Sequence, residues 1–125
     1  MKNRSLAARV GFAVAGWRTA WSRERSFRTQ ATLAAGAVMA LLVARPAPIW
    51  WAVVAITSAL VLALELINSA LEALIDLLHP AIHPEIKAVK DMLAGAVLAI
   101  SCAALVAGAA LLLDWATPVL ARWRF

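Results

Sequence analysis

The chain contains two long apolar runs, residues 49–64 and residues 92–113, in which no residue is charged. A stretch of about 20 apolar residues is long enough to cross the hydrocarbon core of a bilayer as an α-helix. Of the 125 residues, 64% are hydrophobic and the mean hydropathy is +0.83, so a soluble fold would expose too much apolar surface. These runs predict an all-α integral membrane protein.

A chain of this length forms one domain at most, so we expect a single membrane domain over residues 1–125. Apolar residues in its N-terminal part recur at intervals of three and four, and Trp17 and Trp21 lie one turn apart. This pattern is typical of an amphipathic helix on the membrane surface. Proline-containing turns then separate three apolar segments. The expected elements are a surface helix at 4–25 and transmembrane helices at 27–45, 49–77 and 88–113.

Positive charge is distributed unevenly between the two ends of the expected spans. Most of the twelve Lys and Arg residues precede the first span or lie at Lys87 and Lys90, whereas Arg45, Arg122 and Arg124 fall on the opposite side. The positive-inside rule then predicts a multi-pass protein of a bacterial cytoplasmic (inner) membrane with a cytoplasmic N-terminus. The net charge of +5 does not indicate a nucleic-acid partner, because the basic residues flank membrane spans.

Four polar side chains at helical spacing follow the first uncharged run: Glu65, Asn68, Glu72 and Asp76. Intervals of three and four residues place them on one face of a helix. Carboxylates at the end of an apolar membrane run are costly and usually functional. At about 1.5 Å per helical residue, Glu65 lies roughly 22 Å inward from Trp50, and Glu72 roughly 33 Å. Glu65 is therefore expected a helical turn or two deeper in the membrane than Glu72.

The same count brings acids from the other spans to the level of Glu72. Asp91 lies about 36 Å from Trp115, and Glu24 lies about 33 Å from Pro46 if its helix is continuous. Because the hydrocarbon core is about 30 Å thick, all three acids reach the cytoplasmic interface. Three acids from three segments at one level predict a metal or phosphate site.

These side chains have the chemical groups that phosphoryl transfer requires. A nucleotide-bound Mg²⁺ needs one or two carboxylates, which Glu24 and Glu72 could supply, while Lys90 could neutralise phosphate charge. Glu65 could accept the proton of a hydroxyl presented at the membrane surface. The sequence has neither a Gly-x-x-x-x-Gly-Lys-Ser/Thr phosphate loop nor a protein-kinase signature. Any such enzyme therefore belongs to another class.

Several segments carry a specific pattern: Gly16 to Trp21 with Glu24 to Arg28, Glu65 to Asp76, Ile82-His83-Pro84, and Lys90 to Leu98. The sequence E-x-x-N-x-x-x-E-x-x-x-D with a downstream Lys-Asp pair resembles the prokaryotic diacylglycerol kinase family, which includes undecaprenol kinases. The resemblance covers roughly residues 11–113. It implies a homotrimeric bundle whose subunits each have a surface helix and three transmembrane helices, with the site shared between neighbours.

Carried over to matching positions, the resemblance implies a role for each residue of the site. Glu65 resembles the general base that acts on the lipid hydroxyl, and Glu24 and Glu72 resemble the ligands of Mg²⁺ on ATP. The expected ATP-binding residues are Phe12, Glu24, Asn68, Glu72, His83, Lys90 and Asp91. The expected lipid-binding residues are Arg18, Trp21, Arg28, Glu65 and Ala94.

The resemblance implies an ATP-dependent lipid kinase that transfers the γ-phosphate of Mg-ATP to diacylglycerol and forms phosphatidic acid. Undecaprenol is the alternative substrate within the family, because Gln30 and the Leu93-Ala94 pair depart from the enterobacterial pattern. From another class, a small oligomeric proton- or ion-coupled transporter would use Glu65 as an intramembrane proton or cation site. The gathering of the acids at one interface argues against a path across the bilayer.

Three side chains have structural alternatives. Glu65 could be a packing residue that is hydrogen-bonded across a helix bundle. Asp76 could cap the loop or hold Lys90 as readily as it could contact ATP. His79 is expected to be a loop residue.

Overall fold

The computed structural model describes residues 3–79, 81 and 83–121. In this range the chain forms four α-helices and no strand: α1 (Leu6–Arg23), α2 (Arg25–Ala44), α3 (Pro48–Leu78) and α4 (Pro84–Ala121). The all-α fold expected from the sequence is confirmed. Some of the expectations above rest on Lys2, Pro80, Ile82, Arg122 and Arg124, which lie outside the described residues.

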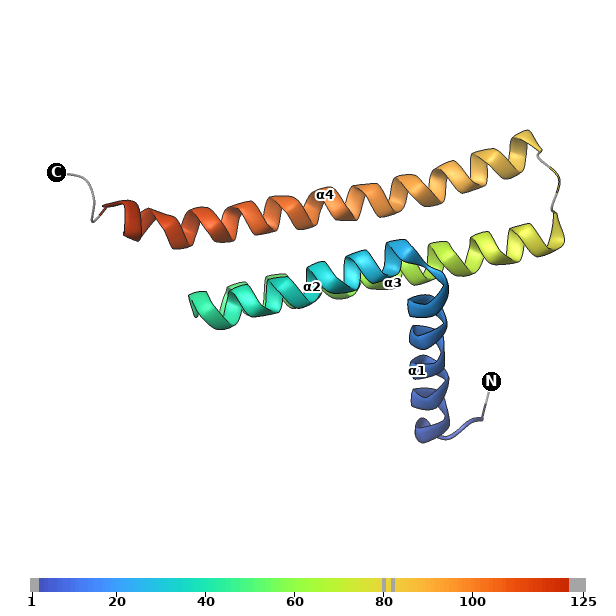
Figure 1. Ribbon diagram of the computed structural model, residues 1–125, viewed down its shortest axis with the longest axis horizontal. Helices are drawn as coiled ribbons and strands as arrows, with labels where there is room; N and C mark the ends of the chain where they lie inside the picture. The colour runs from blue at the N-terminus through green and yellow to red at the C-terminus, as the bar shows by residue number, and fades with distance from the viewer. Residues whose placement is uncertain (1–2, 80, 82, 122–125) are drawn as a thin grey trace.

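Helices α2, α3 and α4 run alongside one another, and α1 lies across their direction (Figure 1). All three are long and apolar enough to cross a membrane, over Arg25–Ala44, Pro48–Leu78 and Pro84–Pro118. At about 1.5 Å per residue, the 31 residues of α3 measure roughly 46 Å and the 38 residues of α4 roughly 57 Å. Both exceed a hydrocarbon core of about 30 Å, so their ends extend into the interfaces.

The helices begin and end where the backbone requires it. Glu24 has φ −110° and ψ 106°, which interrupts the helix and makes a corner between α1 and α2. Arg45, in the left-handed conformation with φ 46°, ends α2. Pro48 and Pro84 lie at the starts of α3 and α4, where a missing N–H is tolerated. The corner at Glu24 gives α1 a direction different from that of the membrane-spanning helices.

Helix α4 continues past the expected end of the third span at residue 113. Asp114 is the first charged residue after the apolar run, and its Oδ2 accepts a 2.8 Å hydrogen bond from the indole Nε1 of Trp50 on α3. Helix α4 proceeds through Pro118 to Ala121. The hydrogen bond joins α3 and α4 at the end of the bundle opposite the 79–83 connection.

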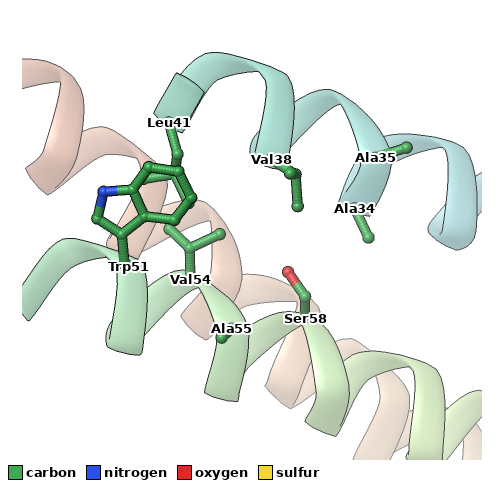
Figure 2. Close-up of a pocket in the computed structure, with 8 residues that line it drawn as sticks. All are labelled: Ala34, Ala35, Val38, Leu41, Trp51, Val54, Ala55 and Ser58. Carbon is green, nitrogen blue, oxygen red and sulfur yellow. The ribbon is translucent and has the colours of Figure 1, made fainter. Parts of the chain in front are cut away.

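Few side chains are buried in the described part of the chain. The buried apolar residues are Ala20, Phe27, Leu41, Val54 and Val61. Between α2 and α3 lies an apolar hollow of about 230 Å³, in which the hydroxyl of Ser58 is directed toward α2 (Figure 2). Most of the large apolar side chains face outward, as expected of helices surrounded by lipid or by other subunits.

Candidate active site

The only charged side chain among the buried residues that the structure describes belongs to Glu65, with an exposed fraction of 3%. Its Oε1 accepts a 2.9 Å hydrogen bond from the hydroxyl of Ser26. Ser26 lies in the first turn of α2, so the hydrogen bond crosses from α2 to α3. A buried carboxylate needs such partners, because its transfer from water is strongly unfavourable.

The chain builds this environment at the corner between α1 and α2. Phe27, in the first turn of α2, is buried with an exposed fraction of 3%. Arg28 Nη1 donates to the carbonyls of Trp21 at 2.9 Å and Ser22 at 3.5 Å, which belong to the last turn of α1. This side chain therefore ties the start of α2 to the end of α1. The free N–H groups at the start of α2 also favour a nearby anion such as Glu65.

Glu24 lies at the N-cap position of α2, yet its side chain makes no capping hydrogen bond. It borders a hollow of about 530 Å³ between α1 and α3. Trp17 and Arg23 of α1 and Ser69 of α3 line the same hollow. The carboxylate is therefore not engaged in capping the helix and is half-exposed beside a space large enough for part of a ligand.

Asn68 follows Glu65 by one turn of α3. Its Oδ1 is buried and has no hydrogen-bond partner among the described residues. Buried polar atoms are rarely left unpaired, so this oxygen calls for a donor from a ligand, a water molecule or another subunit. Glu72, one turn further along the same face, is half-buried.

Lys90 of α4 faces the acidic end of α3. Its Nζ lies 2.6 Å from Oδ1 of Asp76, and the charge of Glu72 also attracts it. Asp76 thus holds Lys90, which is one of the alternatives left open by the sequence. Because the side chain of Asp76 is 64% exposed, the pair contributes little to stability and mainly fixes where the ammonium lies.

Two other expected ATP-binding residues are engaged in local contacts. Asp91 Oδ2 lies 2.6 Å from the Nζ of Lys87, one turn earlier on α4. The Nδ1 of His83 accepts a 3.1 Å hydrogen bond from the backbone N–H of Glu85 and so caps the start of α4. Each side chain retains one further polar atom: the second oxygen of Asp91 and the Nε2 of His83.

All of the remaining expected residues except Arg28 lie on exposed faces of α1 and α4. Phe12 is 45% exposed, with the guanidinium of Arg4 at 5.9 Å from its ring centre. Arg18 and Trp21 are exposed on α1, and Ala94 is exposed on α4. Arg28 is half-buried at the corner, where its contacts are the carbonyls described above. None of these residues is a hydrogen-bond partner of Glu65 among the described residues.

The three acids expected at one level do not gather into a single cluster. In the described part of the chain, no group of three or more His, Cys, Asp or Glu side chains is arranged to hold a metal ion. A complete protein cage is not required for a metal that arrives on a nucleotide, because phosphates and water fill most of its coordination positions. The oxygen donors of Glu24 and Glu72 suit Mg²⁺ in this respect.

A match to one family model covers most of the chain and identifies its family. A family model described as prokaryotic diacylglycerol kinase matches residues 11–112. The chain belongs to this family. The match spans α1 from residue 11, all of α2 and α3, and α4 as far as residue 112. It therefore includes every residue assigned to the site above, and the resemblance inferred from the sequence is confirmed.

A curated relative agrees with the family. The diacylglycerol kinase of Synechocystis sp. (strain ATCC 27184 / PCC 6803 / Kazusa) is 39% identical over 110 residues. The aligned region is 87% of this chain and 63% of the relative. The chain thus spans less than two thirds of the length of this diacylglycerol kinase.

One residue of the site was not identified from the sequence. Ser26 lies two positions after Glu24, where a serine reads as an ordinary first-turn residue of a helix. Only the packing of α2 against α3 reveals that its hydroxyl reaches Glu65. A contact between residues 39 positions apart leaves no signal in a single sequence.

Proposed function

We propose that this protein is an ATP-dependent lipid kinase that phosphorylates diacylglycerol to phosphatidic acid. The observation that carries the proposal is the buried carboxylate of Glu65 on a membrane-spanning helix, beside the corner between α1 and α2. Membership of the prokaryotic diacylglycerol kinase family supports the reaction class. The name of the curated relative favours diacylglycerol over undecaprenol as the lipid alcohol.

In the proposed reaction, the lipid hydroxyl lies against Glu65 and attacks the γ-phosphorus of ATP. The bond between the lipid oxygen and the γ-phosphorus forms as the bond from the γ-phosphorus to the β–γ bridging oxygen breaks. The hydroxyl proton passes to Glu65, and ADP leaves with the electron pair of the broken bond. Positioning and charge neutralisation provide most of the catalysis in such transfers.

The charged end of α3 and α4 provides the nucleotide side of the site. Lys90, held by Asp76, supplies a fixed positive charge for the phosphates. Glu24 and Glu72 are the side chains that would hold Mg²⁺. When bound, this ion neutralises charge on the phosphate oxygens. The unpaired Oδ1 of Asn68 is available to a donor on the nucleotide or on the lipid.

The assembly and orientation are part of the same proposal. We infer a homotrimer with shared sites, supported by the outward-facing apolar side chains of α4, such as Leu105 at 75% and Val106 at 69% exposed. The excess of Lys and Arg around α1 supports a cytoplasmic N-terminus in a bacterial inner membrane. Lys90 and Asp76 then lie on the side where ATP is available.

The test is phosphate transfer from labelled ATP in mixed micelles, with diacylglycerol and undecaprenol offered separately. We expect transfer to diacylglycerol and a loss of at least about a hundredfold in kcat for Glu65→Gln, because general bases contribute on that order. Nucleotide binding by this variant should remain close to that of the parent. Glu85→Gln is the matched control, since it makes the same change at an exposed acid in the first turn of α4.

The outcomes separate the alternatives. If the enzyme prefers undecaprenol, the assignment as a lipid kinase stands and undecaprenol replaces diacylglycerol as the substrate. If well-folded protein transfers phosphate to neither alcohol, the kinase function is rejected. The alternative is then a proton- or ion-coupled transporter in which Glu65 is the intramembrane proton or cation site. Loss of ATP binding in Glu65→Gln would contradict its assignment as the base.

A further inference from the structure

The hydroxyl of Ser26 is used differently from the other hydroxyls around the corner between α1 and α2. Thr19, Ser22, Thr29 and Thr32 each donate to a carbonyl of their own helix, three or four residues earlier. Ser26 instead donates across to Oε1 of Glu65 on α3, at 2.9 Å. This hydroxyl therefore donates to the buried carboxylate and not to a carbonyl of its own helix.

We propose that Ser26 is a positioning residue for Glu65, an inference that rests on the lipid kinase function proposed above. A glutamate side chain has several rotatable bonds, and a single hydrogen bond to one oxygen restricts the rotation of the whole carboxylate. The second oxygen, Oε2, has no hydrogen-bond partner among the described residues. With Oε1 held by Ser26, Oε2 is the atom that receives the proton of the lipid hydroxyl.

The position of Ser26 suits this role because the two residues that follow it are held in place. The next residue, Phe27, is buried with an exposed fraction of 3%. Arg28 anchors the same turn of α2 to carbonyls of α1. A donor carried by this turn holds the carboxylate in a constant place relative to both helices. Small displacements of a reacting group matter, since an error of about 1 Å can reduce a rate by about a hundredfold.

The test uses the full-length protein in mixed micelles with diacylglycerol and Mg-ATP. Ser26→Ala removes the donor and should lower kcat by roughly tenfold, because the base is present but no longer held in place. The KM for ATP and the KM for diacylglycerol should stay within about twofold of the parent, since the hydroxyl contacts neither substrate. Ser26→Thr keeps a hydroxyl at the same position and should restore kcat to within about threefold of the parent.

Ser22→Ala is the matched control. It removes a serine hydroxyl four residues earlier that donates only to the carbonyl of Thr19 in its own helix. Its kcat should equal that of the parent. Thermal unfolding in the same detergent is measured for all variants, so that a loss of folded protein is separated from a loss of turnover.

Each result has a defined meaning. A fall in kcat for Ser26→Ala at constant KM, with rescue by Ser26→Thr, supports the positioning role. An unchanged kcat in Ser26→Ala, with an active parent, overturns this inference and leaves the proposed kinase intact. Equal losses in Ser26→Ala and Ser26→Thr, together with lower thermal stability in both, also overturn it in favour of a packing role. An inactive parent rejects the kinase function itself.

Discussion

The indole Nε1 of Trp50 donates a 2.8 Å hydrogen bond to Oδ2 of Asp114 and so links the first turn of α3 to the last part of α4. The two residues are 64 positions apart in the sequence. This contact lies at the opposite end of the pair of helices from the ion pair of Lys90 and Asp76. Polar contacts thus fix both ends of α3 against α4.

We expect Trp50→Phe to lower stability by about 1 kcal/mol, because it removes one hydrogen bond to a charged acceptor near the exposed membrane interface. The kcat of the enzyme should not change, since the contact is far from Glu65. Thermal unfolding in detergent measures the effect. Trp51→Phe is the control, because it makes the same change at a side chain for which no indole hydrogen bond occurs in the described structure. An equal loss of stability in Trp50→Phe and Trp51→Phe would assign the effect to the smaller ring and not to the hydrogen bond.

The ion pair of Lys90 and Asp76 should affect nucleotide binding more than stability. Lys90→Met removes the charge that faces the phosphates and should raise the KM for ATP by about tenfold. Lys90→Arg keeps a positive charge and should raise this KM by a smaller factor. Asp76→Asn keeps the ammonium but frees it to move, so we expect an increase of about twofold to threefold. Steady-state kinetics with varied ATP tests these values. A larger effect of Asp76→Asn than of Lys90→Met would indicate that Asp76 itself contacts the nucleotide.

The three long apolar helices and the helical segment that carries the acids were predictable from the sequence because both depend on local patterns. Apolar length determines a transmembrane helix, and spacings of three and four determine which residues share a face. Glu65, Asn68 and Glu72 do lie along one helix, and Glu65 is buried within the chain. These properties require no knowledge of what packs against α3.

Features that depend on packing between helices were not predictable. The sequence placed a break between the helices expected at 4–25 and 27–45, but glutamate is a good helix former, so nothing marks Glu24 itself as the corner residue. Small residues on a membrane helix permit close packing, yet a side chain added at Gly95 or Gly108 of α4 would meet nothing within 4 Å in the chain. The hydrogen bond between Trp50 and Asp114 joins residues of two different helices, so the sequence alone does not reveal it.

The contact of Arg28 with the end of α1 predicts a specific effect on lipid binding. Arg28→Gln should weaken the corner, because it removes a charged donor from the last carbonyls of α1. Since α1 carries Arg18 and Trp21, we expect the KM for diacylglycerol to rise about fivefold, with a smaller change in the KM for ATP. Arg25→Gln removes an equal charge from an exposed position of the same turn and should have little effect. Equal effects in the two variants would assign the change to net charge.

The roles of Glu24 and Glu72 can be separated from general electrostatics by their metal dependence. Glu72→Gln should raise the Mg²⁺ concentration for half-maximal activity by about tenfold at fixed ATP, because it replaces a charged oxygen ligand by a neutral amide. Glu24→Gln should act in the same direction, whereas Glu85→Gln should not. If both carboxylates hold the same ion, the double variant should lose less than the product of the two single losses, since the second removal acts on a site already weakened. An unchanged Mg²⁺ dependence in Glu72→Gln would remove Glu72 from the set of metal ligands. A loss in the double variant equal to the product of the two single losses would assign the two acids to separate ions.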